Sequence, residues 1–244
     1  MCWTSAIGPT GRMMNSSPAP RATFSGACAM PSNKKKTILI VANGRRPAES
    51  LVRHVRKKAD YIIAADGGLA HCHYYNLSPD CLIGDLDSYN PRQAASLAEE
   101  RIVRVPDQNR TDLQKALAYA GGLDPAGVMI IGALGGRADH NLANLIIFNN
   151  HNDSWPLTLY DDYGCFKLLD PGENRLADPP GTIISLFTFS GARGVRTRGL
   201  KYALQNETID VSFTGLSNVV SEQPASVSLS DGRLLLYRQG KRLP

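Results

Sequence analysis

Two aspartates, Asp85 and Asp87, stand one residue apart directly after a short apolar segment of the chain. Two carboxylates on one turn concentrate negative charge at the end of a predicted strand. Carboxylate oxygens are ligands that Mg²⁺ prefers, usually beside a substrate phosphate. Taken alone, the same pattern fits a solvated acidic turn that caps a helix beginning near Pro91. The magnesium interpretation therefore depends on which other groups the fold brings to this turn.

A third acid stands at the start of a well-marked helix. Thr111 and Gln114 form a capping-box pattern, which predicts a helix beginning at Asp112. An apolar stripe at i, i+3, i+4 and i+7 gives this helix a core-facing side: Leu113, Ala116, Leu117 and Ala120. Asp112 and Lys115 share the opposite side near the helix N-terminus, where an acid and a lysine suit a metal–phosphate complex. An ordinary surface pair explains this spacing equally well.

A glycine-rich segment, residues 132–140, joins another predicted strand to a helix that runs to about Phe148. Glycines at such a junction let backbone N–H groups approach a phosphate, although the spacing matches neither the P-loop nor the dinucleotide-binding pattern. An arginine at this helix entrance, Arg137, is suited to clamp a phosphate. It begins a polar stripe with Asn141 and Asn144 that is expected to face water. The residues expected to face the core are Ala138, Leu142, Leu145 and Ile146.

These candidate groups need a scaffold that brings strand ends together. Apolar segments of strand length alternate with segments of helical length, and these predicted strands cover residues 37–42, 61–65, 81–83, 102–105 and 128–131. Such alternation predicts an α/β fold, with a doubly wound, mostly parallel sheet and helices on both faces. In these sheets ligands bind beyond the carboxyl ends of the strands.

The pattern changes after Trp155. Short predicted strands between turn residues cover 157–160, 165–169, 182–187, 209–213, 226–229 and 234–237. Asp231 and Gly232 predict a hairpin between the last two of these strands. We therefore expect a disordered leader over residues 1–33, an α/β domain over 34–155, and a small antiparallel β-sandwich domain over 156–244.

Composition narrows the function classes. Five of the 27 basic residues lie within residues 1–36, where there is no acid, so the rest of the chain carries 22 basic and 22 acidic residues. Because residues 37–244 carry no net charge, the composition gives poor support for nucleic-acid binding. No apolar run approaches the roughly 20 residues of a membrane span. Five cysteines without metal-ligand spacing favour a reducing compartment, and we expect the cytoplasm. The basic leader fits an organellar transit peptide or a working start at Met30.

The motifs form a series that resembles one family. In order and spacing they are similar to those of thiamine pyrophosphokinases, a resemblance that covers residues 37–238. The matching segments are residues 66–68, 84–88, 106–115, 132–140, 199–204 and 216–218. The resemblance implies transfer of the diphosphoryl group of ATP to the hydroxyethyl oxygen of thiamine, which gives thiamine diphosphate and AMP.

The resemblance also implies roles for single residues. It places Mg²⁺ on Asp85, Asp87 and Asp112, with Asp66 close by, and assigns catalysis to these three ligands together with Lys115. The residues that it assigns to ATP are Asp66, Gly67, Gly68, Gly135, Arg137, Asp139 and His140. The thiamine-binding residues are Tyr202, which would stack on the pyrimidine, Ser217, which would hydrogen-bond it, and Asn218. Family members are homodimers whose substrate site is shared between subunits, and the same is expected here.

Other functions remain to be compared with this one. A pterin diphosphokinase of related fold would use the same carboxylates with a different acceptor, so only the C-terminal sandwich separates the two. A nicotinamide-dependent oxidoreductase is disfavoured because Gly-x-Gly-x-x-Gly is missing after the first predicted strand. A non-catalytic nucleotide-binding protein would not need an acidic cluster at three strand ends.

Overall fold

A computed structural model describes residues 35–86, 97–212 and 215–240 of the chain. The predicted disordered leader, residues 1–33, lies outside this range. So do Asp87 and the helix expected near Pro91.

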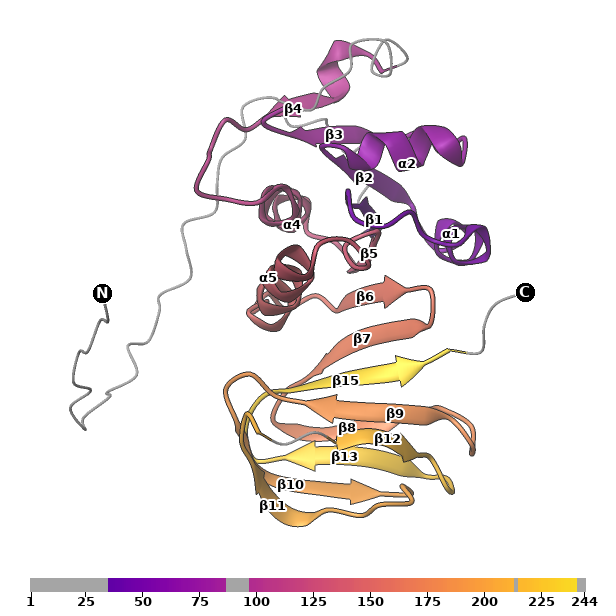
Figure 1. Cartoon of the computed structure of the whole chain (residues 1–244), viewed down its shortest axis with the longest axis vertical. Helices are drawn as coiled ribbons and strands as arrows, with labels where there is room; N and C mark the ends of the chain where they lie inside the picture. Colours follow the sequence, from indigo (N-terminus) through magenta and orange to yellow (C-terminus); the bar gives the residue numbers. More distant parts are fainter. Residues whose placement is uncertain (1–34, 87–96, 213–214, 241–244) are drawn as a thin grey trace, which may run out of the picture.

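One large sheet runs through the molecule, and its first half is parallel (Figure 1). The strand order in this half is β6-β5-β1-β2-β3-β4. Its strands are β1 (Thr37–Val41), β2 (Tyr61–Ala65), β3 (Cys81–Gly84), β4 (Ile102–Arg104), β5 (Gly127–Ile131) and β6 (Leu157–Asp161). Neighbouring strands in this half pair in parallel. The order turns at β1, because the chain adds β2, β3 and β4 on one side and β5 and β6 on the other. The predicted doubly wound sheet is confirmed.

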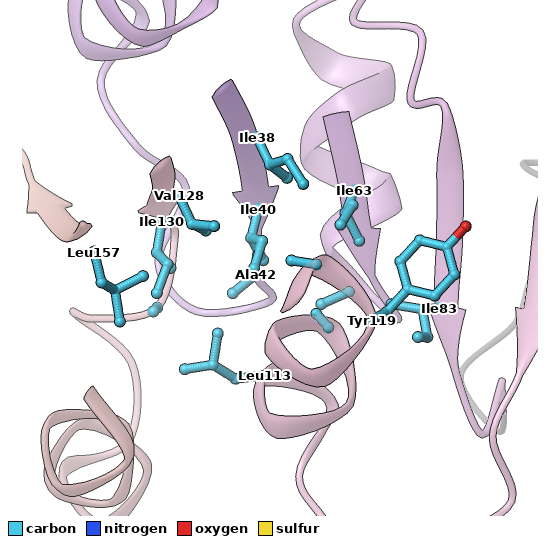
Figure 2. Packing of buried hydrophobic residues seen from close by; sticks show 14 of the residues in the cluster. Ile38, Ile40, Ala42, Ile63, Ile83, Leu113, Tyr119, Val128, Ile130 and Leu157 are labelled. Atoms are coloured by element: carbon cyan, nitrogen blue, oxygen red, sulfur yellow. The ribbon is translucent and has the colours of Figure 1, made fainter. Parts of the chain in front are cut away.

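Helices cover both faces of the parallel strands. Helices α4 (Asp112–Gly122) and α5 (Ala138–Asn149) pack on one face, whereas α1 (Glu49–Arg56) and α2 (Gly68–Tyr74) pack on the other. A 3₁₀ turn, Glu99–Arg101, precedes β4. Alternate residues of one strand face opposite cores: Ile38 and Ile40 belong to the core on the α4 and α5 face, and Leu39 and Val41 to the core on the α1 and α2 face. Figure 2 shows Leu113 and Tyr119 of α4 against the strand side chains.

The helix predicted from the capping box begins where expected. The Thr111 hydroxyl accepts from the Gln114 backbone N–H at 3.3 Å, and the Gln114 side chain accepts from the Thr111 N–H at 3.0 Å.

Among the described residues, no helix has the length and apolar character needed to cross a membrane.

The prediction for the sides of α5 was wrong for three of the four residues expected to face the core, and right for Leu145, which packs against it. Ala138, Leu142 and Ile146 are exposed, with Leu142 at 54% and Ile146 at 41%. The Asn144 amide instead points inward and donates to the Ala133 carbonyl at 2.7 Å. The reason is that the helix packs through its C-terminal part, where Phe148 is fully buried, while the asparagine satisfies a loop carbonyl. An apolar side of α5 is therefore left facing outward.

The second half of the large sheet is antiparallel and forms one layer of a β-sandwich. Its strands, which continue from β6, are β7 (Gly164–Leu169), β15 (Leu234–Gln239), β9 (Ile183–Phe187) and β12 (Gly215–Val219). The other layer is made by β11 (Gln205–Ile209), β10 (Ala192–Arg198), β13 (Ala225–Leu229) and β8 (Gly172–Leu176), with β14 (Asp231–Gly232) beside β10. An apolar core lies between these layers. The predicted antiparallel β-sandwich is confirmed.

The large sheet passes through residue 155 without interruption. Strand β6 pairs in parallel with β5 and antiparallel with β7, so both predicted domains contribute strands to one hydrogen-bonded sheet. What changes at this point is the direction of the strands. The domain boundaries at 34–155 and 156–244 remain a prediction.

The predicted hairpin at Asp231 and Gly232 was wrong. Strand β13 pairs with β10 and β8, whereas β15 pairs with β7 and β9 in the other layer. Gly232 has a φ of +84° and pairs with Ala192 of β10, so the chain turns a corner between layers here. The strand predicted over residues 209–213 ends at Ile209 instead. Strands β8, β10 and β12 were missed because their exposed, polar stretches lack a clear alternation.

We predict that Gly68→Ala destabilises the fold, because a Cβ there would lie 2.0 Å from the Val41 carbonyl oxygen. Such a backbone clash should cost about 3 kcal/mol of unfolding free energy. Gly122→Ala is the matched control, since a Cβ at this helical glycine meets nothing within 4 Å. It should leave stability unchanged or raise it by about 0.5–1 kcal/mol. Urea unfolding of both variants measures the difference, and equal midpoints would contradict the close approach of α2 to β1.

Candidate active site

Two acidic strand ends lie side by side in the parallel half of the sheet. Asp66 follows β2, and its backbone N–H donates to the Ile83 carbonyl of β3 at 2.8 Å. The Asp66 side chain packs against Gly84 so closely that a Cβ added to the glycine would lie 2.9 Å from the Asp66 Cβ. Asp85 comes next in the chain. Glycine at the end of β3 therefore allows two carboxylates to occupy adjacent strand ends.

Lys115 joins this edge to the start of α4. Its Nζ lies 3.1 Å from an Asp85 oxygen and 3.1 Å from an Asp112 oxygen. The lysine side chain is only 1% exposed, while the two carboxylates are 21% and 35% exposed. The contact between Lys115 and Asp112 is thus part of a buried cluster and not an ordinary surface pair. We call Asp66, Asp85, Asp112 and Lys115 the acid–lysine cluster.

The cluster keeps its lysine charged. Burial by itself lowers the pKa of Lys115, but the hydrogen bonds from Nζ to Asp112 and Asp85 outweigh it, so this pKa lies above its ordinary value. One ammonium group faces two carboxylates, which leaves local negative charge beside a fixed positive charge. That arrangement suits a cation bound to phosphate.

The described residues supply two carboxylates that could hold magnesium and no complete metal site. Within the described ranges, no three acidic, histidine or cysteine side chains converge as a complete metal site. Asp85 and Asp112 supply two carboxylates, and Asp87 lies outside the described residues. Mg²⁺ commonly takes one or two protein carboxylates and completes its shell with water and phosphate oxygens. The residues present fit that mode of binding.

Gly67 and Gly68 hold the start of α2 against β1. A Cβ at Gly67 would lie 2.2 Å from the Asn43 side-chain nitrogen, and one at Gly68 would lie 2.0 Å from the Val41 carbonyl oxygen. At Gly68, where the close atom belongs to the backbone, only glycine allows this approach. The turn that carries Asp66 is thereby fixed next to the loop that follows β1.

The loops after β1 and β5 are bound to each other. The Gly44 N–H donates to the Gly132 carbonyl at 2.5 Å, and the Arg45 N–H donates to the Leu134 carbonyl at 3.1 Å. The Arg45 side chain crosses Gly135, whose φ is +83° and whose added Cβ would lie 2.8 Å from the Arg45 Cβ. Arg45 was missed in the sequence analysis. Its signal was available, since it follows Asn43-Gly44 directly after a predicted strand.

Arg137 and Asp139 pair at the start of α5. The guanidinium lies 2.6 Å from the carboxylate, and the two side chains are 75% and 62% exposed. The hydrogen bond from Arg137 lowers the pKa of Asp139. Asp139 also accepts the backbone N–H of His140 at 2.9 Å. Asp139 thus holds the Arg137 side chain and the backbone of His140, and the ATP-binding roles of these three residues remain a prediction.

The residues predicted to bind the acceptor substrate form a second group, on the sandwich. We call Tyr202, Ser217 and Asn218 the acceptor group. Asn218 is buried, and its amide donates to the Tyr202 carbonyl at 2.8 Å and accepts the Tyr202 N–H at 3.0 Å. The Tyr202 side chain is 60% exposed. Ser217 has a φ of +56°, and its N–H donates to the Ser185 hydroxyl at 3.1 Å. Asn218 therefore positions the loop that presents the Tyr202 ring, and Ser217 precedes it in β12, at an irregularity in the pairing with β9.

The two groups lie far apart within one chain. Asp85 follows β3, Asn218 belongs to β12, and eight inter-strand steps separate these strands in the sheet order. At about 4.8 Å per step, the separation along the sheet is roughly 38 Å. Figure 1 shows β3 near the top of the long axis and β12 in the sandwich in the lower part of the molecule. One chain brings the cluster together but leaves the acceptor group at a distance.

Fold and site together define a class: an α/β protein with an acid–lysine cluster at its strand ends, whose sheet continues into an antiparallel sandwich. Comparison with known proteins identifies the family within this class. A family model described as "Thiamin pyrophosphokinase, catalytic domain" matches residues 52–158, and one described as "Thiamin pyrophosphokinase, vitamin B1 binding domain" matches residues 173–234. Together the matches span more than half of the chain. The protein belongs to the thiamine pyrophosphokinase family.

Individual relatives agree with this assignment. Thiamine pyrophosphokinase of Bacillus subtilis is 28% identical over 210 residues, which cover 83% of this chain and 98% of the relative. Its crystal structure superposes with a TM-score of 0.71 at 25% identity and covers 84% of this chain and 100% of that chain. Thiamine pyrophosphokinase 1 of rice is 28% identical, over 64% of each protein. The chain thus spans just under two thirds of the rice relative. The Candida albicans enzyme, with a TM-score of 0.72 at 18% identity, shares the fold.

We predict that Lys115→Met lowers the unfolding free energy by about 1–3 kcal/mol, because it leaves two facing carboxylates without their cation. Lys35→Met is the matched control, since the Lys35–Asp124 pair is 60% and 74% exposed. It should change stability by less than about 0.5 kcal/mol. Chemical denaturation at neutral pH measures both. Equal losses in the two variants would show that Lys115 does not hold the cluster together.

Proposed function

We propose that this protein transfers the diphosphoryl group of ATP to the hydroxyethyl oxygen of thiamine and releases AMP. The observation that carries the proposal is the bridge from the buried Lys115 to Asp85 and Asp112 at the strand ends. Membership of the family, with matches to both its catalytic and its vitamin B1 binding models, supports thiamine as the acceptor. The pterin diphosphokinase and the non-catalytic nucleotide-binding protein are not favoured by these comparisons.

The acid–lysine cluster would act on the polyphosphate. Asp85 and Asp112 would hold Mg²⁺ together with Asp87, and the bound ion would neutralise phosphate charge. The ammonium of Lys115, held protonated by its two carboxylates, would offset the negative charge that develops as the β-phosphorus is attacked. Arg137, held by Asp139, would approach the phosphates from the start of α5. One strand-end aspartate would accept the proton of the attacking hydroxyl.

The acceptor group would bind the vitamin. The exposed Tyr202 ring would offer a face for the pyrimidine, and the exposed Ser217, next to Asn218 in β12, would offer a hydroxyl. Asn218 would position the Tyr202 ring through its hydrogen bonds to the Tyr202 backbone. In this division of labour, the proposed domain at residues 34–155 binds Mg-ATP and the one at 156–244 binds thiamine.

We infer a homodimer whose substrate site is shared between subunits. The separation of roughly 38 Å along the sheet keeps the two groups of one chain apart, so a second copy would have to supply the acceptor residues. Apolar side chains that one copy leaves exposed support such a contact: Leu142 and Ile146 on α5, and Leu216 on β12. A reducing, cytoplasmic location remains our proposal, supported by the buried free thiols of Cys72, Cys81 and Cys165.

Incubation of the full chain with ATP, Mg²⁺ and thiamine tests the reaction. We expect equimolar AMP and thiamine diphosphate, because attack at the β-phosphorus expels AMP. Asp85→Asn should lose most turnover because it removes a metal ligand. It should still fold, with an unfolding free energy lowered by about 1–3 kcal/mol, because the buried Lys115 loses one of its two carboxylate partners and keeps Asp112. Lys35→Met should keep wild-type turnover.

Two results would contradict the proposal. ADP with thiamine monophosphate would indicate a simple kinase. Turnover of a hydroxymethyl pterin in place of thiamine would indicate the alternative acceptor.

A further inference from the structure

Strand β12, which carries two residues of the acceptor group, departs from regular pairing with β9. The regular pairing is interrupted between Gly215 and Asn218. In this interval Leu216 and Ser217 of β12 stand opposite a single residue of β9, Ser185. Two residues opposite one form a β-bulge, which bends a strand and re-aims its side chains. We call residues 215–218 the β12 bulge.

The backbone of the β12 bulge is strained at Ser217. Its φ of +56° lies in the left-handed region, which is unfavourable for a residue with a side chain. Burial of the side chain does not stabilise this conformation, because Ser217 is exposed. Strained residues of this kind persist where neighbouring groups hold them, and they are concentrated at functional sites. The bulge therefore needs a group that holds it.

Ser185 supplies that group from the neighbouring strand. Its hydroxyl accepts the backbone N–H of Ser217 at 3.1 Å, and the serine is only 7% exposed. Ile184 and Leu186, on either side of it, point into the sandwich core, so Ser185 points to the opposite side of the sheet. A buried hydroxyl thus takes the role that a backbone carbonyl has in a regular ladder.

The β12 bulge sets which side of the sheet each of its residues faces. Successive strand residues point to opposite sides, so one residue more or fewer reverses the side chains beyond it. Asn218 is held by its own hydrogen bonds, to both backbone groups of Tyr202 and from the Val219 N–H at 2.8 Å. The side-chain contact that fixes the backbone of Ser217 is the one with Ser185. Of the two neighbours, Ser217 is therefore the one whose direction depends on Ser185.

We propose that Ser185 is a positioning residue for the acceptor substrate. By holding the backbone of Ser217 in the β12 bulge, it directs the Ser217 hydroxyl toward the thiamine pyrimidine. This inference rests on the proposed function, in which Ser217 binds the acceptor. Without the Ser185 hydroxyl, the Ser217 N–H loses its partner, and the strained φ loses the contact that holds it.

Steady-state transfer and calorimetric titration of the full chain with thiamine test the inference. Ser185→Ala should raise the thiamine KM and Kd by about 5- to 150-fold, the ratio that loss of one buried hydrogen-bond partner can produce. The ATP KM should stay within about twofold, because the acid–lysine cluster lies at the far end of the sheet.

Two further variants separate positioning from general damage to the fold. Ser185→Thr keeps the hydroxyl and should restore the thiamine KM to within about threefold of wild type. Ser226→Ala is the matched control, since this serine of β13 is 8% exposed and lies in the other layer of the sandwich. It should leave both KM values unchanged. If Ser185→Ala does not fold, Ser185→Cys takes its place, because sulfur is a weak acceptor and should give the same selective loss.

A double variant tests whether Ser185 acts through Ser217. In a Ser217→Ala background, Ser185→Ala should change the thiamine KM by less than about twofold, because the hydroxyl that it positions is already gone. Losses that multiply would overturn the inference, as would a wild-type thiamine KM in folded Ser185→Ala or a wild-type protein that binds no thiamine. Thiamine binding with the expected losses but without transfer from ATP would leave this inference standing and reject the proposed function.

Discussion

The continuity of one sheet through both halves of the chain is the constraint on which the rest of the structure depends. Strand β6 pairs with β5 on one side and β7 on the other, so the parallel strands and the sandwich share one hydrogen-bonded layer. A sheet holds its strands at fixed spacing. The strand ends that carry acids and the loop that carries Tyr202 are therefore held near opposite edges, and neither can approach the other without breaking β pairing.

Within the parallel half, a short chain of contacts fixes the chemistry. Gly84 lets Asp66 and Asp85 occupy neighbouring strand ends, and the capping box fixes where α4 begins. Lys115 then reaches Asp85 from the first turn of that helix. Because the lysine is buried and its ammonium group is hydrogen-bonded to two carboxylates, the position of its charge is fixed before any ligand binds. Such preorganisation is the form of electrostatic stabilisation that phosphoryl transfer most needs.

The parallel strands and α4 were predictable because each has a strong local signal: an unbroken apolar run or a capping box. The sides of α5 were not, since Asn144 is turned inward by a carbonyl in another loop. The corner at Gly232 looked like a hairpin because local turn chemistry does not reveal which layer the next strand joins. Asp85, Asp112 and Lys115 were named from the sequence. Their shared contact depends on β3 lying beside α4, which no single motif shows. The position of Arg45 against Gly135 likewise depends on a contact between two loops that are far apart in the sequence.

Complementation between two inactive variants tests the shared site most directly. In the proposed dimer, Asp85→Asn would disable the acid–lysine cluster and Tyr202→Ala would disable the acceptor group, so a dimer with one subunit of each would keep one intact shared site. After unfolding and joint refolding at equal amounts, the account predicts about a quarter of wild-type turnover at low thiamine concentration, because half of the dimers are mixed and each has one working site. Either variant refolded with the double variant Asp85→Asn/Tyr202→Ala should show no such recovery. Mixed dimers that form but stay as inactive as their parents would contradict the shared site.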